Sequence, residues 1–414
     1  MAPIIRTVIG AEGSLLAHPL TEPGGLPVPP ALAALYAAAS MFVVVHLVPQ
    51  DRHDEMRADR RALEPWTGRL TRAETIGRGA SMVVLLTAVL VARLGAESEL
   101  ENIVPALILG VGWPLALLAG TLGASWRWFD PLDGAARLID RTPLPRAPDD
   151  VRWAAVPAAA IAGYVAIPVT ALAPRSLGAA LAVYVIVMVG GALYMGRAWL
   201  GRADAVGLLL TWLPLVGRGR LTSWSPPRGA DMVLGILTGG LLFGAIRRSA
   251  LWGDLNTSDG ATLLASAGFA GCAALAAVVV TKSEAAARSR GSAGAVTAAM
   301  VPAVASTAIA LALARNRFFV SLQLLPSLAS DPSGLGWDLF GTAGGAIDPN
   351  PLGTTGLSLV QAGMLLLGHL AGAFVFARRA APRARAVGAI ALALSLAAGI
   401  LAVSAVGELP PATG

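Results

Sequence analysis

Residues 177–200 read LGAALAVYVIVMVGGALYMGRAWL, and Arg197 is the single charged residue in this run. Comparable apolar runs occupy 103–122, 259–281 and 386–406. A helix of about 20 apolar residues matches the roughly 30 Å hydrocarbon core of a bilayer. Hydrophobic residues make up 55% of the 414-residue chain, and the mean hydropathy is +0.67. The sequence therefore predicts an integral membrane protein.

The apolar runs predict helices rather than barrel strands. Only helices and closed barrels satisfy every backbone group inside lipid, and barrel strands alternate polar and apolar residues. These runs are continuous, so we predict an all-α, polytopic helical membrane protein that forms a single domain over 1–414. About ten spans are predicted, at 30–49, 79–96, 103–122, 151–173, 177–200, 231–246, 259–281, 294–315, 356–377 and 386–406.

The basic residues predict the orientation of these spans. Loops rich in arginine alternate with loops that hold few basic residues, and cytoplasmic loops are the ones that carry excess Lys and Arg. The basic loops are 50–78, 123–152, 197–230, 282–293 and 378–385. We therefore expect these loops in the cytoplasm and both termini outside, with the lead-in 1–29 and the long connection 316–355 on the outer face.

The net charge of +6 follows from this topology signal and indicates no nucleic-acid partner. The bilayer is the expected partner, and a bacterial cytoplasmic membrane is the expected location. Three segments between the predicted spans carry predictions of their own. The tryptophans of residues 125–134 are expected to form an aromatic belt with Trp153 at the membrane interface. The same segment predicts a turn at Asp130 and Pro131. Residues 205–217 are apolar but too short to span, so we expect an interfacial helix there. The connection 316–355 is long enough to indicate function.

Several strings in these segments carry a family resemblance. They are 101–105 (ENIVP), 126–131 (WRWFDP), 249–252 (SALW), 330–343 (SDPSGLGWDLFGTA) and 368–372 (GHLAG), with 17–18 and 26–29 in the lead-in. On these strings, which run in order from about residue 17 to 380, the chain resembles the bacterial, largely actinobacterial, membrane proteins named for fenitrothion hydrolase. The resemblance implies hydrolysis of an organophosphate triester.

The chain departs from that family where the chemistry is expected. Members of the family carry histidines in the eighth span and another shortly after the position of His369, whereas 294–315 and the residues after Gly372 contain none. Phosphotriester hydrolysis at neutral pH usually needs a metal-activated water and about three convergent ligands. We therefore favour a non-catalytic membrane component, either a complex subunit that binds a membrane-protein partner or a transporter-like protein. The alternative is a membrane-embedded hydrolase of neutral organophosphate triesters.

His369 is the first candidate site residue, because an ionisable group inside lipid is costly and often functional. Gln361 lies two turns earlier on roughly the same face. Gly368 and Gly372 form a small-x-x-x-small pair that favours a close neighbouring helix. We predict that His369 faces the bundle interior and finds its partner on another helix. Two roles stay open, a neutral imidazole that ties helices together and a ligand or proton-relay group.

The outer face supplies the second candidate site. The residues expected on that side are His18, Glu101, Asp331, Trp337, Asp338 and Asp348. Together they offer ligands for a divalent metal or a polar molecule, with Trp337 as a cap. The alternative is a set of solvated loop acids without a ligand.

Overall fold

The computed structural model describes residues 30–48, 71–123, 126–139, 149–166, 173–247, 261–313, 317–343, 346–348 and 350–405. These residues form helices joined by turns, and within these ranges the only β-type pairing is an isolated bridge between Asp150 and Arg228. The predicted all-helical class is confirmed.

Seven helices in the described ranges are long and apolar enough to cross a membrane. They are α3 (Arg72–Leu94), the continuous run of α4 (Ile103–Pro105), η2 (Ala106–Gly112) and α5 (Trp113–Leu122), α9 (Pro174–Met195), α15 (Ala261–Arg288), α16 (Ala295–Ala312), α18 (Gly353–Arg379) and α19 (Arg385–Ala405). The three other predicted spans contain the shorter helices α2 (Pro30–Leu47), α8 (Ala155–Ala166) and α13 (Ala230–Ile246). A multi-pass helical architecture follows, and the count of ten spans stays a prediction.

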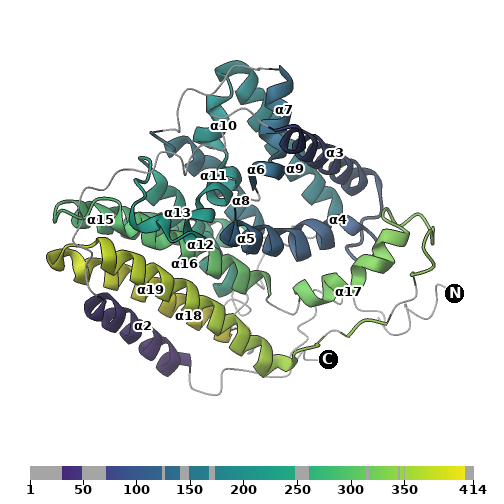
Figure 1. Ribbon diagram of the computed structural model, residues 1–414. Coiled ribbons are helices and arrows are strands. Elements are labelled where there is room, and N and C mark those ends of the chain that lie inside the picture. The colour runs from purple at the N-terminus through teal and green to yellow at the C-terminus, as the bar shows by residue number, and fades with distance from the viewer. Residues whose placement is uncertain are drawn as a thin grey trace.

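Helix α16 lies at the centre of the bundle. Every side chain from Ala295 to Ala310 is buried, and the helix packs against α13, α15, α18 and α19. Figure 1 shows α18, α19 and α2 side by side at one edge of the molecule. Gly368 faces Ser306 and the Pro302 carbonyl oxygen, which would lie 2.7 Å from a Cβ at this position. The close helix neighbour predicted from the glycine pair is therefore confirmed, and it is α16.

Contacts between loops divide the molecule into two ends. At one end, the Val151 N–H donates to Arg228 O (2.8 Å). At the same end, Arg379 donates to Trp224 O (2.6 Å) and to Ala293 O (3.3 Å). Arg385 donates to His46 O (3.0 Å). At the other, the Ala96 N–H donates to Ser333 O (2.6 Å), and Arg93 donates to Arg175 O (3.1 Å). Segments from the loops predicted as cytoplasmic thus contact one another, as an alternating topology requires. Which end faces the cytoplasm stays a prediction.

Two predicted loops contain helices. The connection 316–355 begins with α17 (Arg317–Ser330), which lies beside α4 in Figure 1 and buries Val320, Leu324 and Leu328. Residues 72–78 of the predicted loop 50–78 belong instead to α3. The Thr71 hydroxyl accepts a hydrogen bond from the Glu74 N–H, and the Glu74 carboxylate accepts one from the Thr71 N–H. Such a capping box starts a helix at that residue.

The expectation of an interfacial helix at 205–217 is wrong. The segment forms α11 (Ala205–Trp212) and α12 (Pro214–Gly217), and its side chains, including Leu209, Trp212 and Leu213, belong to the main buried core. An interfacial helix keeps a polar face toward water, whereas this stretch is apolar on all sides and packs against α5 and α8. It is a short helix inside the protein.

Cysteine labelling tests the orientation. In a Cys272→Ala background, a cysteine at exposed Ser289 is expected to resist an impermeant thiol reagent on intact cells, and a cysteine at exposed Ala346 is expected to react. The reason is that Ser289 belongs to a basic loop, which is retained in the cytoplasm. Both cysteines should react once the membrane is permeabilised, which controls for accessibility. The reverse pattern on intact cells would invert the topology.

Candidate functional site

His369 is fully buried on α18 and bonded to two partners. Its Nδ1 lies 2.8 Å from Leu365 O, and its Nε2 lies 3.0 Å from the Ser395 hydroxyl on α19. A carbonyl oxygen only accepts hydrogen bonds, so Nδ1 carries a proton, and in the neutral imidazole Nε2 then accepts from the Ser395 hydroxyl. The predicted inward orientation and the partner on another helix are both confirmed. The imidazole joins α18 to α19, and its role as a ligand or relay stays a prediction.

Gln361 makes a separate connection. Its buried side-chain amide donates from Nε2 to Ala310 O on α16 over 2.8 Å. The two candidate residues of α18 therefore bond different helices, and the structure records no hydrogen bond between them. Each residue forms a hydrogen bond between two helices, and lipid hydrocarbon around the bundle could not supply such a bond.

At the end of the molecule predicted to be outside, the candidate acids bind backbone N–H groups of the loop after α17. The Asp331 carboxylate accepts the backbone N–H groups of Leu335 (2.9 Å), Gly336 (2.5 Å) and Trp337 (3.0 Å). Asp338 accepts the Ser330 hydroxyl (2.6 Å) and the Ala343 N–H (3.2 Å). The Ser330 hydroxyl bond is the main reason why the pKa of Asp338 lies below its usual value.

Of the other outer-face candidates, Glu101 is exposed and lies beside this loop, with its carbonyl oxygen 3.0 Å from the position of a Cβ on Gly334. Asp348 is also exposed and pairs its backbone N–H with Gln323 Oε1 over 2.7 Å. His18 lies outside the described residues. Within the ranges that the structure covers, no three His, Cys, Asp or Glu side chains are grouped to hold a metal ion. A divalent metal on this face stays a prediction.

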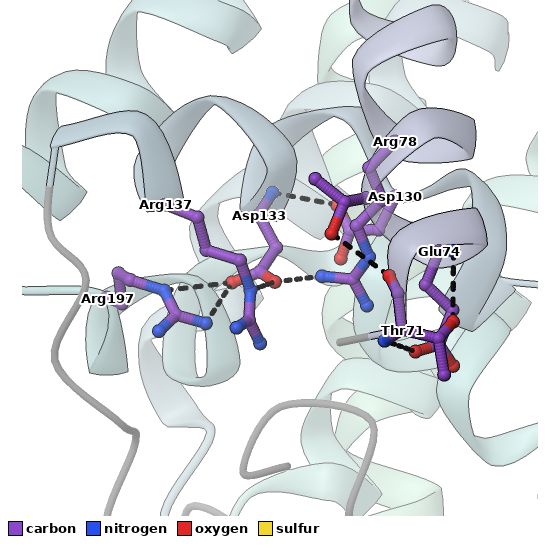
Figure 2. Close-up of polar contacts among 8 residues, drawn as sticks. Thr71, Glu74, Arg78, Asp130, Asp133, Arg137 and Arg197 are labelled. Carbon is purple, nitrogen blue, oxygen red and sulfur yellow. Dashed lines mark hydrogen bonds and ion pairs between the residues drawn. The ribbon is translucent and has the colours of Figure 1, made fainter. Parts of the chain in front are cut away.

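A further group of buried charges comes from the basic loops 50–78, 123–152 and 197–230, and Figure 2 shows the contacts within it. Asp133, which is completely buried, accepts from three arginines. Arg78 and Arg137 both donate to its Oδ2, with Arg137 Nε at 2.6 Å, and Arg197 Nη2 donates to Oδ1 at 2.7 Å. Arg78 and Arg197 are each only 2% exposed. We call Arg78, Asp130, Asp133, Arg137, Arg197 and Asp204 the charged cluster.

Short helices bring the charged cluster together. Asp130 lies between α6 (Trp126–Phe129) and α7 (Pro131–Ile139), and its Oδ1 accepts the Asp133 N–H at 2.9 Å, which caps the start of α7. Gly134 lets α3 approach α7, because a Cβ there would lie 3.0 Å from the Cβ of Arg78. Arg197 follows Gly196, whose φ of 77° ends α9 and turns the chain into α10 (Ala198–Ala203). At Asp130 and Pro131, where a turn was predicted, the chain passes from α6 into α7.

The carboxylates of the cluster differ in their electrostatics. Burial, reinforced by Asp133 and Asp204, raises the pKa of Asp130 from 3.8 to about 8, and the positive charge of Arg78 acts against this rise. Burial also raises the pKa of Asp204, which accepts the Gly207 N–H (3.0 Å) and the Tyr184 hydroxyl (2.5 Å) at Oδ1. Perturbed carboxylates of this kind concentrate at functional sites.

Sequence reasoning missed the charged cluster and assigned part of its segment to an aromatic belt. Trp128 and Trp153 are exposed as a belt requires, whereas Trp126 is half-buried against the core. One local signal was present, the four-residue spacing of Asp133 and Arg137 on one helix face. The two arginines that complete the site lie 55 and 64 residues from Asp133, so only the fold reveals them.

Comparison of the chain with known protein families, with curated proteins and with solved structures finds no match. The resemblance to fenitrothion hydrolase-like proteins therefore stays a prediction.

Proposed function

We propose that the chain is a non-catalytic, multi-pass component of the bacterial cytoplasmic membrane that binds a partner membrane protein through its outer loop. The observation that carries this proposal is an exposed apolar surface on an ordered loop. Leu335, Trp337, Leu339 and Phe340 are each between 51% and 69% exposed within six residues of sequence. We call these four side chains the outer apolar patch.

The backbone beneath the outer apolar patch is held in place. Asp331 binds three successive N–H groups from Leu335 to Trp337, and the Thr342 hydroxyl donates to Pro326 O at 2.6 Å. The loop also joins the start of the third span, where the Ile103 N–H donates to Pro332 O at 3.1 Å. A loop that is already ordered loses little further entropy when it binds, which favours affinity.

The composition of the patch suits a protein contact. Trp is enriched among the residues that supply most of the binding energy at protein interfaces, and exposed apolar patches mark interaction sites. The segment 330–350 carries Asp331, Asp338 and Asp348 and no basic residue. Carboxylates repel an anionic membrane surface, so this segment fits a partner protein that carries basic groups better than it fits lipid headgroups.

The alternative of a membrane-embedded organophosphate hydrolase finds less support. Its best candidate residue, His369, already uses both ring nitrogens in bonds to Leu365 and Ser395. Hydrolysis of a neutral phosphotriester by the purified protein, together with metal analysis of the same sample, is the measurement that would favour the alternative.

Site-specific photo-crosslinking in intact cells tests the proposal. A photoreactive phenylalanine analogue at Leu335 or Phe340 is expected to give one discrete protein adduct, because these side chains point away from the bundle. The same analogue at Ile186, which is 69% exposed on α9, is the matched control and should react with lipid only.

A second variant checks that the adduct depends on the patch. Trp337→Ala is expected to reduce the adduct at Leu335 at least about tenfold, which corresponds to a loss of about 1.4 kcal/mol of binding free energy. The captured protein should also co-purify in a fixed ratio with the wild-type chain and not with this variant. Lipid adducts alone at both outer positions, as at Ile186, would contradict the proposal.

A further inference from the structure

We propose that Asp130 is a proton-binding site, and that its ionisation redistributes Arg78 between two carboxylates and so changes how tightly α3 packs on α7. This inference concerns the opposite end of the molecule from the outer apolar patch and is independent of the proposed function.

Three arginines, three other carboxylates and one tyrosine lie around Asp130, either directly or through a shared partner. From α7, whose start Asp130 caps, come Asp133 and Arg137, from α3 comes Arg78, and from the start of α11 comes Asp204. Arg197 reaches the same group through Asp133, and Tyr184 of α9 reaches it through Asp204. Glu74, one turn before Arg78, engages the backbone N–H of Thr71 (Figure 2).

The geometry disfavours three ionised carboxylates at once. Asp130, Asp133 and Asp204 are each at most 1% exposed, so water does not screen their repulsion. Three guanidinium groups bind Asp133 directly. Asp130 has no guanidinium group among the hydrogen bonds that the structure records for it, and its Oδ1 accepts a backbone N–H. A neutral acid keeps that bond, so the proton resides at Asp130.

Loss of the proton changes the partner of Arg78. When Asp130 is neutral, the attraction on Arg78 is directed to Asp133, with which it forms an ion pair. Ionised Asp130 adds a second negative charge on the same side of α3 and repels Asp204 at the start of α11. Because Gly134 leaves no side chain between Arg78 and α7, a movement of this arginine is transmitted to the contact between the two helices.

The sign of the stability change follows from the raised pKa of Asp130. Below the unfolded value of 3.8 both states are protonated, and between 3.8 and about 8 only the folded state holds the proton. The free energy of unfolding therefore falls as the pH rises through this window. The melting temperature of the wild type is expected to decrease from about pH 6 to about pH 9 more steeply than that of Asp130→Asn, since asparagine resembles the neutral acid.

Infrared difference spectroscopy on the full chain in lipid nanodiscs tests the site. Raising the pH is expected to remove a carbonyl band of a protonated carboxylic acid with a midpoint of about 8. The band should be absent in Asp130→Asn and unchanged in Asp150→Asn, because Asp150 is half-exposed and its bond from Arg152 holds its pKa low. Asp130→Glu retains a carboxyl group and should restore a titrating band if folding of the asparagine variant is in question.

A neighbouring substitution separates Asp130 from Asp204. Asp204→Asn removes one repelling carboxylate, so the band should persist with its midpoint shifted to lower pH. The proposal is overturned if no carboxylic acid titrates in the wild type between about pH 6 and about pH 10. It is also overturned if the band survives in Asp130→Asn and disappears in Asp204→Asn, or if the melting temperatures of wild type and Asp130→Asn depend equally on pH.

Discussion

Replacing Asp133 with asparagine is expected to lower the free energy of unfolding by about 3–5 kcal/mol, the usual loss when one partner of a buried ion pair is removed. Asparagine fills nearly the same volume but supplies no charge. Arg78 and Arg197 would remain buried without the carboxylate that both now contact. Heat or detergent denaturation of the purified protein measures the change.

Two variants give this prediction a control. Asp150→Asn removes a half-exposed carboxylate whose partner Arg152 is itself 66% exposed, and such surface pairs contribute about 0–1 kcal/mol. Combining Asp133→Asn with Arg197→Gln removes one uncompensated charge and should recover part of the loss. Wild-type stability of Asp133→Asn alone would mean that Asp130 and Asp204 already neutralise the arginines, and Asp133 would not be the centre of the cluster.

Substituting Gly368 with valine is expected to force α18 away from α16 and to destabilise the protein by about 1–3 kcal/mol or more, the range for overpacked cores. The new Cβ would meet the Ser306 side chain and would lie 2.7 Å from the Pro302 carbonyl oxygen. A backbone oxygen cannot rotate away as a side chain can, so the helices themselves have to separate.

Gly363 is the matched control on the same helix. A Cβ at this position meets no atom within 4 Å, so Gly363→Val changes helix propensity without a clash. Denaturation of both variants in the same detergent compares the two sites. Equal stability of Gly368→Val and Gly363→Val would show that α16 and α18 do not depend on their close contact.

The sequence predicted the helices better than their surroundings. A continuous apolar run is sufficient to indicate a helix, and each described part of the ten predicted spans contains one. The segment 205–217 was misplaced because an apolar stretch too short to span does not reveal whether lipid or protein surrounds it. Helix α17 was missed because Pro326 and the adjacent polar residues obscure a spacing of four residues between Val320, Leu324 and Leu328.

Site prediction was limited by distance along the chain. His369 was found because its cost inside lipid can be judged from one residue, and its partner Ser395 lies 26 residues away on another helix. The charged cluster gave no such signal, because arginines beside a span are ordinary topology markers. Asp133 can be recognised as the centre of a buried ion-pair group only when the positions of α3, α7 and the start of α10 are known.

The contact between Arg385 and the end of α2 has a consequence for the order in which the protein is made. Arg385 donates to His46 O across a separation of 339 residues, and α2 packs against α19 and α18. At about 5–20 residues per second, the ribosome needs about 17–68 s to produce this partner after His46. During that time α2 lacks the helices that cover it in the folded protein. Until α18 and α19 have been made, nascent α2 therefore depends on lipid or on an insertion factor.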